Sequence, residues 1–429
     1  MKRLFFLFLI SFSLVSFARD SVGEQRTAVV FFDLLEDGKE PSIDLYKKAI
    51  FDEAKSVSHY VKEVSHQKAW LTGKTYPWLR LKGLGKTCYL SSSDVLETII
   101  QNNLLDLTQV DRLLVFNHMN HTGECAKNNS FGFSTHGKET YRTSIGEVKL
   151  SLAQFHATNR FVLPKLPVQP LSNITSSVIA HELGHSFGST GHSNILDCGK
   201  DIMSFDRSQC TQSAIADMFT LLGGEGFFRP SLHFSACHKE ELGWIGVKDE
   251  SLVVINKENK SRIVKLRPFS TVGKNVSVRI NLESPFPVPC VNPTNCTVAI
   301  QSLFLEYRTA RGFDENISKL PFESARYFNQ LVLAPDYYAA SKEIKTNGIQ
   351  IRGGFYKNDK CMTSYNLDVT PESLHYRNPQ NNEVLSYSLY DNLDSFLLPG
   401  MTFAESVNGL SISMKEIDKD GNAVVEIRY

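Results

Sequence analysis

The sequence predicts an α+β protein, and three features support this prediction. In the first half, strand-like and helix-like segments alternate, which is typical of helices packed on a sheet. After about residue 245 the segments become short, β-rich and separated by turn residues. The composition, 42% hydrophobic and 11% aromatic over 429 residues, is that of an ordinary globular chain. We therefore expect an N-terminal α/β layer followed by an all-β, sandwich-like C-terminal domain.

The first eighteen residues are typical of a secretory signal peptide. Residues 2–3 are basic, residues 4–17 are largely apolar, and residues 16–18 (SFA) have the small-x-small pattern of a cleavage site. The apolar stretch is shorter than the roughly 20 residues that a membrane-spanning helix needs. We expect a secreted protein, extracellular or in the periplasm or cell envelope, with no membrane association after cleavage. The predicted divisions are a signal peptide (1–18), a first domain (19–246) and a β-rich C-terminal domain (247–429).

The charge balance argues against nucleic acid as a partner. Lys plus Arg and Asp plus Glu each number 46, and the chain has no long run of basic residues. Binding of nucleic acid through bulk charge needs a concentrated positive face, which this balance does not predict. We expect a monomer whose partner is a protein or peptide.

The eight cysteines predict disulfide bonds. Their number is even, none lies in the signal peptide, and an exported chain meets oxidising conditions. The short spacings of Cys198 from Cys210 and of Cys290 from Cys296 favour two local pairs. Eight cysteines allow about 105 pairings, so the sequence does not choose among the rest. A zinc site made of cysteines is the alternative, but the chain has no CxxC motif. The remaining cysteines are Cys88, Cys125, Cys237 and Cys361.

Periodicity predicts the elements of the first half. A compact run of β-branched and aromatic residues indicates a buried strand, and apolar residues every three or four positions indicate a helix. A stretch rich in Asn, Gly, His and Thr indicates a long surface loop. In chain order we expect a strand at 26–34, a helix at 42–64, a strand at 69–72 ending at Gly73, a helix at 94–102, a strand at 111–116 and a loop at 117–145.

In the second half, the same reasoning predicts only strands. Asp420-Gly421 is a hairpin dipeptide between the last two of them. Glu306 and Arg308 lie two apart on a predicted strand and share one face, which favours a structural ion pair over catalysis. The predicted strands are 251–256, 261–266, 276–281, 298–307, 410–417 and 422–429.

One segment carries recognisable chemistry, the HExxH motif at residues 181–185. It lies on a predicted helix whose apolar face is formed by Ile179, Leu183 and Phe187. His181 and His185 are also four residues apart, but they lie on another face. Two such imidazoles reach a single Zn²⁺, and the Glu182 carboxylate between them can hold the metal-bound water.

The residues after the motif predict how a third ligand returns to the metal. Gly188 adopts a left-handed conformation at low cost, so the helix is expected to end there with a sharp turn. His192 follows four residues later and is the expected third ligand, with Asp197 as the alternative. Gly184 inside the helix costs about 1 kcal/mol relative to Ala. Its presence indicates another segment crossing closely.

The segment from His181 to His192 resembles the extended zinc motif of metzincin metalloproteases, in particular of their gametolysin-like and immune-inhibitor-A-like branches. Residues 201–204 (DIMS) resemble the metzincin Met-turn, which implies that Met203 forms an apolar floor under the metal. The usual motif is HExxHxxGxxH, whereas here the third histidine comes one residue later. Further segments similar to these proteins are 56–73, 196–199 (LDCG), 238–244 (HKEELGW) and 304–314.

The resemblance implies a metzincin-type catalytic domain over 19–246, with a twisted mixed sheet and a zinc-binding active-site helix. We therefore predict a secreted zinc endopeptidase that hydrolyses peptide bonds with a zinc-bound water and Glu182 as general base. The alternative is an inactive secreted binding protein, for carbohydrate or protein, that retains the same fold. A third possibility is a zinc hydrolase that acts on a non-peptide amide.

Overall fold

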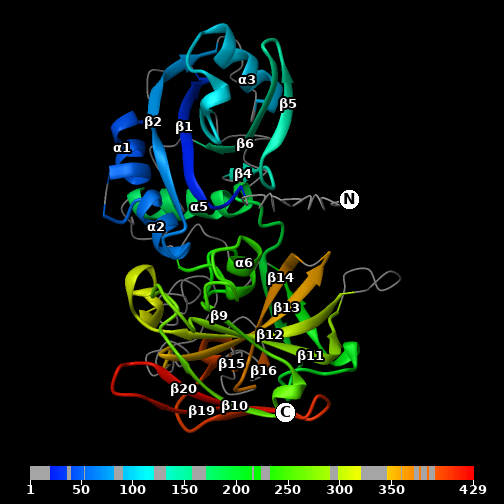
Figure 1. Cartoon of the computed structure of the whole chain (residues 1–429). Helices are drawn as coiled ribbons and strands as arrows, with labels where there is room; N and C mark the ends of the chain where they lie inside the picture. The colour runs from blue at the N-terminus through cyan, green and yellow to red at the C-terminus, as the bar shows by residue number, and fades with distance from the viewer. Residues whose placement is uncertain are drawn as a thin grey trace, which may run out of the picture.

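The computed structural model describes two parts of the chain, stacked one above the other in Figure 1. The predicted signal peptide and Cys88, Cys125, Cys290 and Cys296 lie outside the described residues. The described residues are 20–35, 40–52, 54–81, 90–119, 132–156, 171–214, 217–223, 232–289, 298–319, 345–358, 360–371, 376–377, 384–385 and 392–429.

The first part is built on a six-stranded sheet with the order β2-β1-β3-β6-β4. Four of its strands are parallel, and two short ones run antiparallel to β6. The parallel strands are β1 (Gly23–Asp33), β2 (Ala69–Arg80), β3 (Arg112–His118) and β6 (Gly146–His156), and the antiparallel ones are β4 (Gly132–Ser134) and β5 (Glu139–Thr143).

Helices cover both faces of this sheet. Val29 and Phe31 of β1 pack toward α2 (Val57–Val64) and α5 (Leu171–Ser186). Val30 and Phe32 face the other way and pack against α3 (Ser92–Gln101). A strand buried on both faces has no polar side, which explains the continuous apolar run in its sequence.

The predicted single helix over 42–64 is wrong, because the chain breaks it in two. The structure has α1 (Ile43–Lys47), which continues as a wider π-helical turn over Lys48–Asp52, and then the separate helix α2. Ser56 is the cause of the restart, since its side chain accepts a hydrogen bond from the His59 N–H and caps α2. The predicted strand at 26–34 and the predicted helix at 94–102 are confirmed to within a few residues.

Two further expectations for the first part are corrected. Strand β2 does not end at Gly73 but continues to Arg80. Gly73 lies against the Thr27 carbonyl of β1, so its role is to let two strands approach closely. Residues 117–145 are not a continuous loop, because β4 and β5 lie within them and pair with β6.

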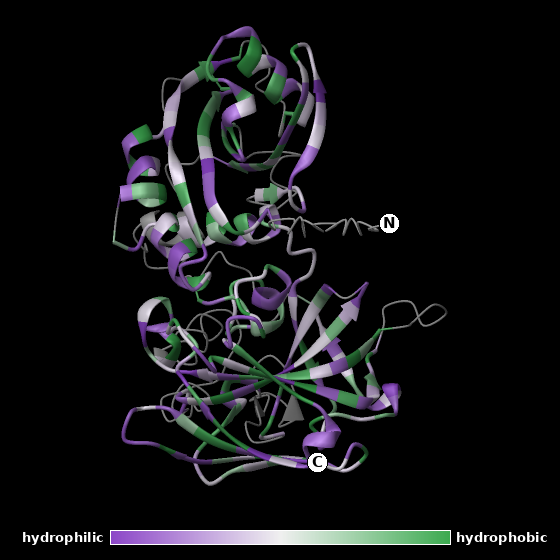
Figure 2. Cartoon of the chain, viewed as in Figure 1, coloured by the Kyte–Doolittle hydropathy of each residue, from purple (hydrophilic) through white to green (hydrophobic). Residues whose placement is uncertain are grey.

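The second part contains two larger sheets that share one hydrophobic core. The eight-stranded sheet has the order β8-β7-β14-β13-β12-β11-β9, with β17 beside β13, and the four-stranded sheet has the order β10-β20-β19-β18. Figure 2 shows hydrophobic residues concentrated on the strands. The eight are β7 (Ser193–Asp197), β8 (Thr211–Ser213), β9 (Leu252–Ile255), β11 (Ser277–Pro287), β12 (Ala299–Arg308), β13 (Gly348–Lys357), β14 (Lys360–Leu367) and β17 (Phe396–Leu397). The four are β10 (Ser261–Leu266), β18 (Thr402–Glu405), β19 (Leu410–Ile417) and β20 (Ala423–Arg428), and β15 (Tyr376–Arg377) pairs separately with β16 (Val384–Leu385).

The α+β class and the β-rich character of the second half are thus confirmed. The predicted strands there match β9 to β12, β19 and β20, and Gly421 has the positive φ of 80° that the hairpin between the last two requires. Strands β7 and β8 precede residue 246 but belong to the sheet of the second part. The chain therefore enters the second sheet directly after α5.

Helix α6 (Ala236–Glu241) lies between the two parts (Figure 1). A disulfide from Cys237 to Cys361 joins it to β14. The predicted local pair of Cys198 with Cys210 is also confirmed, and it closes the loop between β7 and β8. Both disulfides therefore attach segments that precede residue 246 to the second sheet or its loops.

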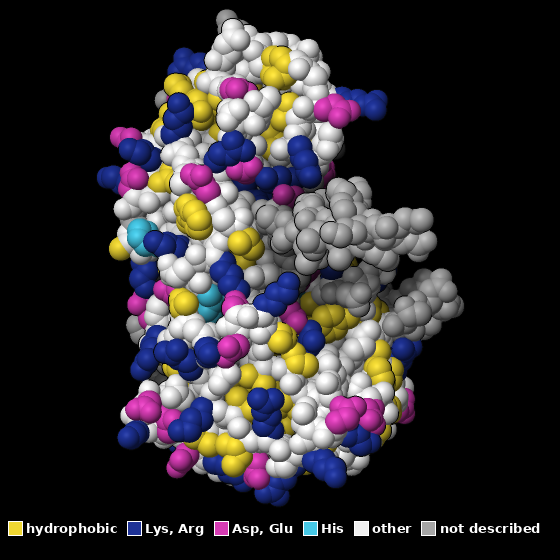
Figure 3. Space-filling view, in the orientation of Figure 1, with side chains coloured by type: hydrophobic (Ala, Val, Ile, Leu, Met, Phe, Trp, Pro, Cys, Tyr) yellow, Lys and Arg dark blue, Asp and Glu magenta, His cyan; other side chains and the backbone are white. Residues whose placement is uncertain are grey.

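The described residues contain no helix that is long and apolar enough to cross a membrane. On the face drawn in Figure 3, basic and acidic side chains are interspersed. This mixture agrees with the equal numbers of the two charge types in the sequence.

Arg112, at the start of β3, fixes the end of α5 to the sheet. Its side chain is fully buried, and its guanidinium donates to the carbonyl of Ser186, the last residue of α5. Further hydrogen bonds run to Gln25 Oε1 at 2.9 Å and Ser151 Oγ at 2.9 Å. The guanidinium also stacks over the Phe187 ring at 4.3 Å. One cation thus binds a helix-end carbonyl that has no partner within the helix.

We predict that Arg112→Met lowers the free energy of unfolding by roughly 3–5 kcal/mol, because several buried polar groups lose their partner at about 1–3 kcal/mol each. Urea denaturation measures this. The control is Arg26→Met, which breaks the half-exposed ion pair with Asp111 (2.8 Å) and should cost less than about 1 kcal/mol. Equal losses in the two variants would contradict this account of Arg112.

Candidate metal centre

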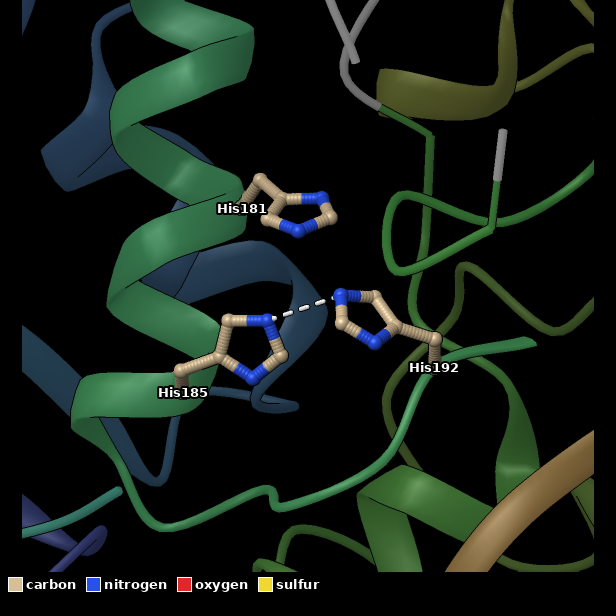
Figure 4. A group of neighbouring side chains, drawn as sticks. All are labelled: His181, His185 and His192. Carbon is tan, nitrogen blue, oxygen red and sulfur yellow. Dashed lines mark hydrogen bonds between the residues drawn. The ribbon is translucent and has the colours of Figure 1, made fainter. Parts of the chain in front are cut away.

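The HExxH motif lies on the last turns of α5, as the sequence predicts. Ile179, Leu183 and Phe187 are buried in the cluster between α5 and the first sheet. That packing turns the opposite side of the helix toward the second part of the molecule. His181 and His185 are on this side (Figure 4).

The chain leaves α5 through the glycine turn that the sequence predicts. Gly188 has φ of +114°, a conformation that favours glycine, and its N–H donates to the His185 carbonyl at 2.7 Å. The Ser189 N–H donates to the Gly184 carbonyl at 3.2 Å. These bonds satisfy carbonyls at the end of the helix and turn the chain back toward it.

The turn brings His192 to the two helical histidines. One ring nitrogen from each of the three lies within 4.8 Å of the others, and Nε2 of His185 is 3.2 Å from Nε2 of His192. The ring centres of His181 and His192 are 5.4 Å apart. Figure 4 shows the three rings meeting in the space between α5 and the segment that carries His192.

Backbone carbonyls fix two of the rings. Nδ1 of His181 lies 2.8 Å from the Leu221 carbonyl, and Nδ1 of His185 lies 2.9 Å from the Ser189 carbonyl. A carbonyl oxygen only accepts, so each Nδ1 carries the proton and each Nε2 keeps its lone pair. Metal-binding histidines are held in this way, with one nitrogen bound to a protein acceptor and the other on the metal.

Burial keeps these histidines neutral. It lowers the pKa of His181 to about 4 and that of His185 to about 3, with smaller effects from neighbouring histidines. The pKa of His192 is lowered by the same cause. Because only a neutral imidazole donates a lone pair, all three rings are ready to bind a cation at neutral pH.

Glu182 is the buried acid of the site. Its side chain is 9% exposed, and burial raises the pKa of its carboxyl group to about 7. A Cβ at Gly132 of β4 would lie 3.1 Å from Glu182 Cγ, so the glutamate packs tightly beneath that strand. A carboxyl group with a pKa near 7 both accepts and donates a proton at neutral pH.

Met203 and Asp197 are the two other residues considered for the site. Met203 is in the loop closed by the Cys198–Cys210 disulfide and packs against the core shared by the two sheets of the second part. Its placement as a floor under a metal stays a prediction. Asp197 accepts a hydrogen bond from the Gly199 N–H at 2.8 Å and is outside the histidine group. Of the two alternatives for the third ligand, the structure thus brings His192 to the site.

Sequence reasoning missed three neighbours of the site. The carbonyls of Leu221 and Ser189 leave no signal in a sequence, because every residue has one. His136 follows β4, its Nδ1 is 3.2 Å from the same Ser189 carbonyl, and its ring centre is 5.2 Å from that of His185. The pairing of β4 with β6, and the hydrogen bond from the Gly137 N–H to the His185 carbonyl, place His136 there, and the predicted loop over 117–145 gives no sign of either.

Within the described ranges, these three histidines form the one group whose His, Cys, Asp or Glu ligand atoms lie close enough to hold a metal ion. Three neutral imidazole nitrogens fit a zinc ion and leave a fourth position for water or substrate. Comparison of the chain with protein-family models and with curated proteins finds no match. The resemblance to metzincins therefore rests on the motifs alone.

The close crossing expected at Gly184 is confirmed. A Cβ there would lie 2.8 Å from Phe234 Cε1 and 3.1 Å from Leu222 Cδ2. We predict that Gly184→Ala lowers the free energy of unfolding by about 1–3 kcal/mol, because the added methyl group overpacks this contact. Helix propensity alone predicts a gain of about 1 kcal/mol.

The matched test is the same substitution in a Phe234→Leu background, where the clashing ring atoms are absent. The loss caused by Gly184→Ala, measured by urea denaturation, should be smaller there. A Gly184→Ala protein that is more stable than wild type would show that no segment crosses the helix closely.

Proposed function

We propose that the protein is a secreted zinc endopeptidase. The observation that carries this proposal is the convergence of three neutral imidazoles, from His181, His185 and His192, next to the buried Glu182. Imidazole nitrogens suit zinc among the common divalent ions, and three ligands with an open fourth position are typical of catalytic zinc. When bound, the zinc supplies a Lewis acid that polarises the peptide carbonyl and activates water.

The protein's own groups would orient the imidazole ligands and transfer the proton. The Leu221 and Ser189 carbonyls hold His181 and His185 in the tautomer that presents Nε2. Glu182 would accept a proton from the attacking water and deliver it to the departing amine, and its pKa of about 7 suits both transfers. Glu182 lies between His181 and His185 on α5, so its carboxyl group and these two ligands share one rigid helix.

The finer architecture belongs to the same proposal. A mostly parallel sheet covered by the HExxH helix supports a metzincin-type catalytic domain over 19–246. Two sheets that enclose one core support a sandwich-like C-terminal domain over 247–429, to which β7 and β8 from the preceding segment add two strands. Two disulfides among the described cysteines accord with an exported protein. The alternative, an inactive binding protein with this fold, predicts no hydrolysis even with metal present.

We predict that Glu182→Gln retains about one zinc per chain and loses hydrolysis of a denatured protein substrate by on the order of 10²–10⁴-fold or more. The amide has nearly the size of the carboxyl group but cannot accept the proton. Zinc is measured by metal analysis of the purified protein. In the wild type, a chelator should remove both zinc and activity.

The matched control is Glu147→Gln, an exposed glutamate at the opposite end of β6 from the residues that pair with β4. It should keep zinc and activity. A fully active Glu182→Gln protein would overturn the assignment of the base. A folded, metal-free and inactive wild type would favour the binding protein, and cleavage of small amides without cleavage of protein would favour the amide hydrolase.

A further inference from the structure

The third histidine is presented by the second sheet of the molecule, not by the sheet beneath α5. His192 immediately precedes β7, and β7 pairs in parallel with β14, with Ser193 opposite Ser364 and Asn194 opposite Tyr365. The first two histidines belong to a helix of the first part. The distance from His192 to the two histidines of α5 therefore depends on how the two parts are joined.

The loop before His192 is pressed against β14. Gly191 lies so close to this strand that an added Cβ would collide with the Met362 carbonyl and would lie 3.2 Å from the Thr363 nitrogen. The neighbouring Thr190 hydroxyl lies 3.3 Å from the Met362 sulfur. Glycine at 191, where the chain departs from the usual motif, thus allows the loop to reach the strand.

The first histidine depends on the same sheet by another route. Arg352 of β13 forms a fully buried ion pair with Asp217. Asp217 Oδ1 accepts from the Phe219 N–H at 3.0 Å and so shapes the turn that carries Leu221, whose carbonyl holds His181. A guanidinium of the second sheet is therefore connected to a ring on α5 through one short segment.

Helix α6 provides a third connection. Its Glu241 accepts from the hydroxyl of Ser189, the residue whose carbonyl fixes His185. Glu240 accepts from the Tyr356 hydroxyl of β13 at 2.9 Å and pairs with Arg279 of β11. The Cys237–Cys361 disulfide joins the same helix to β14.

We propose that β13 and β14 complete the metal centre, with Gly191 and the Asp217–Arg352 pair as positioning residues. This inference rests on the proposed function, because it takes the three histidines as metal ligands. The C-terminal half is then an obligatory part of the site and not an appended module. Its strands β13 and β14 determine the position of the His192 ring and the orientation of the His181 ring.

The test is Gly191→Ala in the full chain, with Co²⁺ as the probe. Co²⁺ replaces zinc in such sites, and its visible absorption reports the number and geometry of the ligands. Because the added methyl group must move the loop, the affinity for Co²⁺ should fall on the order of 100-fold, and the spectrum should approach that of His192→Ala. Gly246→Ala is the matched control, since a Cβ at residue 246 meets nothing within 4 Å, and it should bind like wild type.

Asp217→Asn is the second variant. If Gly191→Ala does not fold, the Co²⁺ affinity of Asp217→Asn tests the inference instead. It keeps an oxygen for the Phe219 N–H but weakens the pair with Arg352, so Co²⁺ should bind about 10–100-fold more weakly. Folded variants with wild-type Co²⁺ affinity and spectrum would overturn the inference and leave the proposed function standing. A wild type that binds no Co²⁺ would overturn the proposed function itself, and the inference with it.

Discussion

Two arginines and a glutamate on β12 and β13 are buried away from water, so their charges have to be neutralised inside the protein. Arg308 and Arg352 each lie 3.1 Å from the Glu306 carboxylate, and all three side chains are fully buried. Arg308 also pairs with Asp314 at 2.7 Å, and Arg352 pairs with Asp217. A buried charge deprived of its partner costs about 3–5 kcal/mol, so the segments that bring these carboxylates are held firmly to the sheet.

The same carboxylates also bind the backbone of the segments that reach toward α5. Glu306 accepts from the N–H of Ala236, the first residue of α6, at 2.6 Å. Asp314 accepts from the N–H of His233 at 3.1 Å, next to the Phe234 ring that packs against Gly184 of α5. The carboxylates that neutralise the arginines inside the second sheet therefore also hold the backbone of the segments that pack against α5.

The sequence predicts what depends on local spacing and misses what depends on distant partners. The helix with His181 and His185, the turn at Gly188, the return of His192 and the Glu306–Arg308 pair all follow from neighbours within a few positions. The break in the predicted helix at 42–64 depended on a single capping serine, and β4 and β5 form only because β6 lies beside them. The carbonyls that orient the rings, and the contact of Gly191 with β14, join parts of the chain that no local pattern relates.

The pairing of β7 with β14 also determines the order in which parts of the protein fold. Strand β7, which directly follows His192, pairs with β8 nearby, but on its other side Ser193 lies opposite Ser364, so this second pairing cannot form until most of the chain has been made. Pairings between such distant segments form late in folding, because a large loop must close first. A chain that is still emerging would thus hold His181, Glu182 and His185 on α5 without His192 fixed beside them. The three histidines would come together only after β14 has been synthesised and has paired with β7.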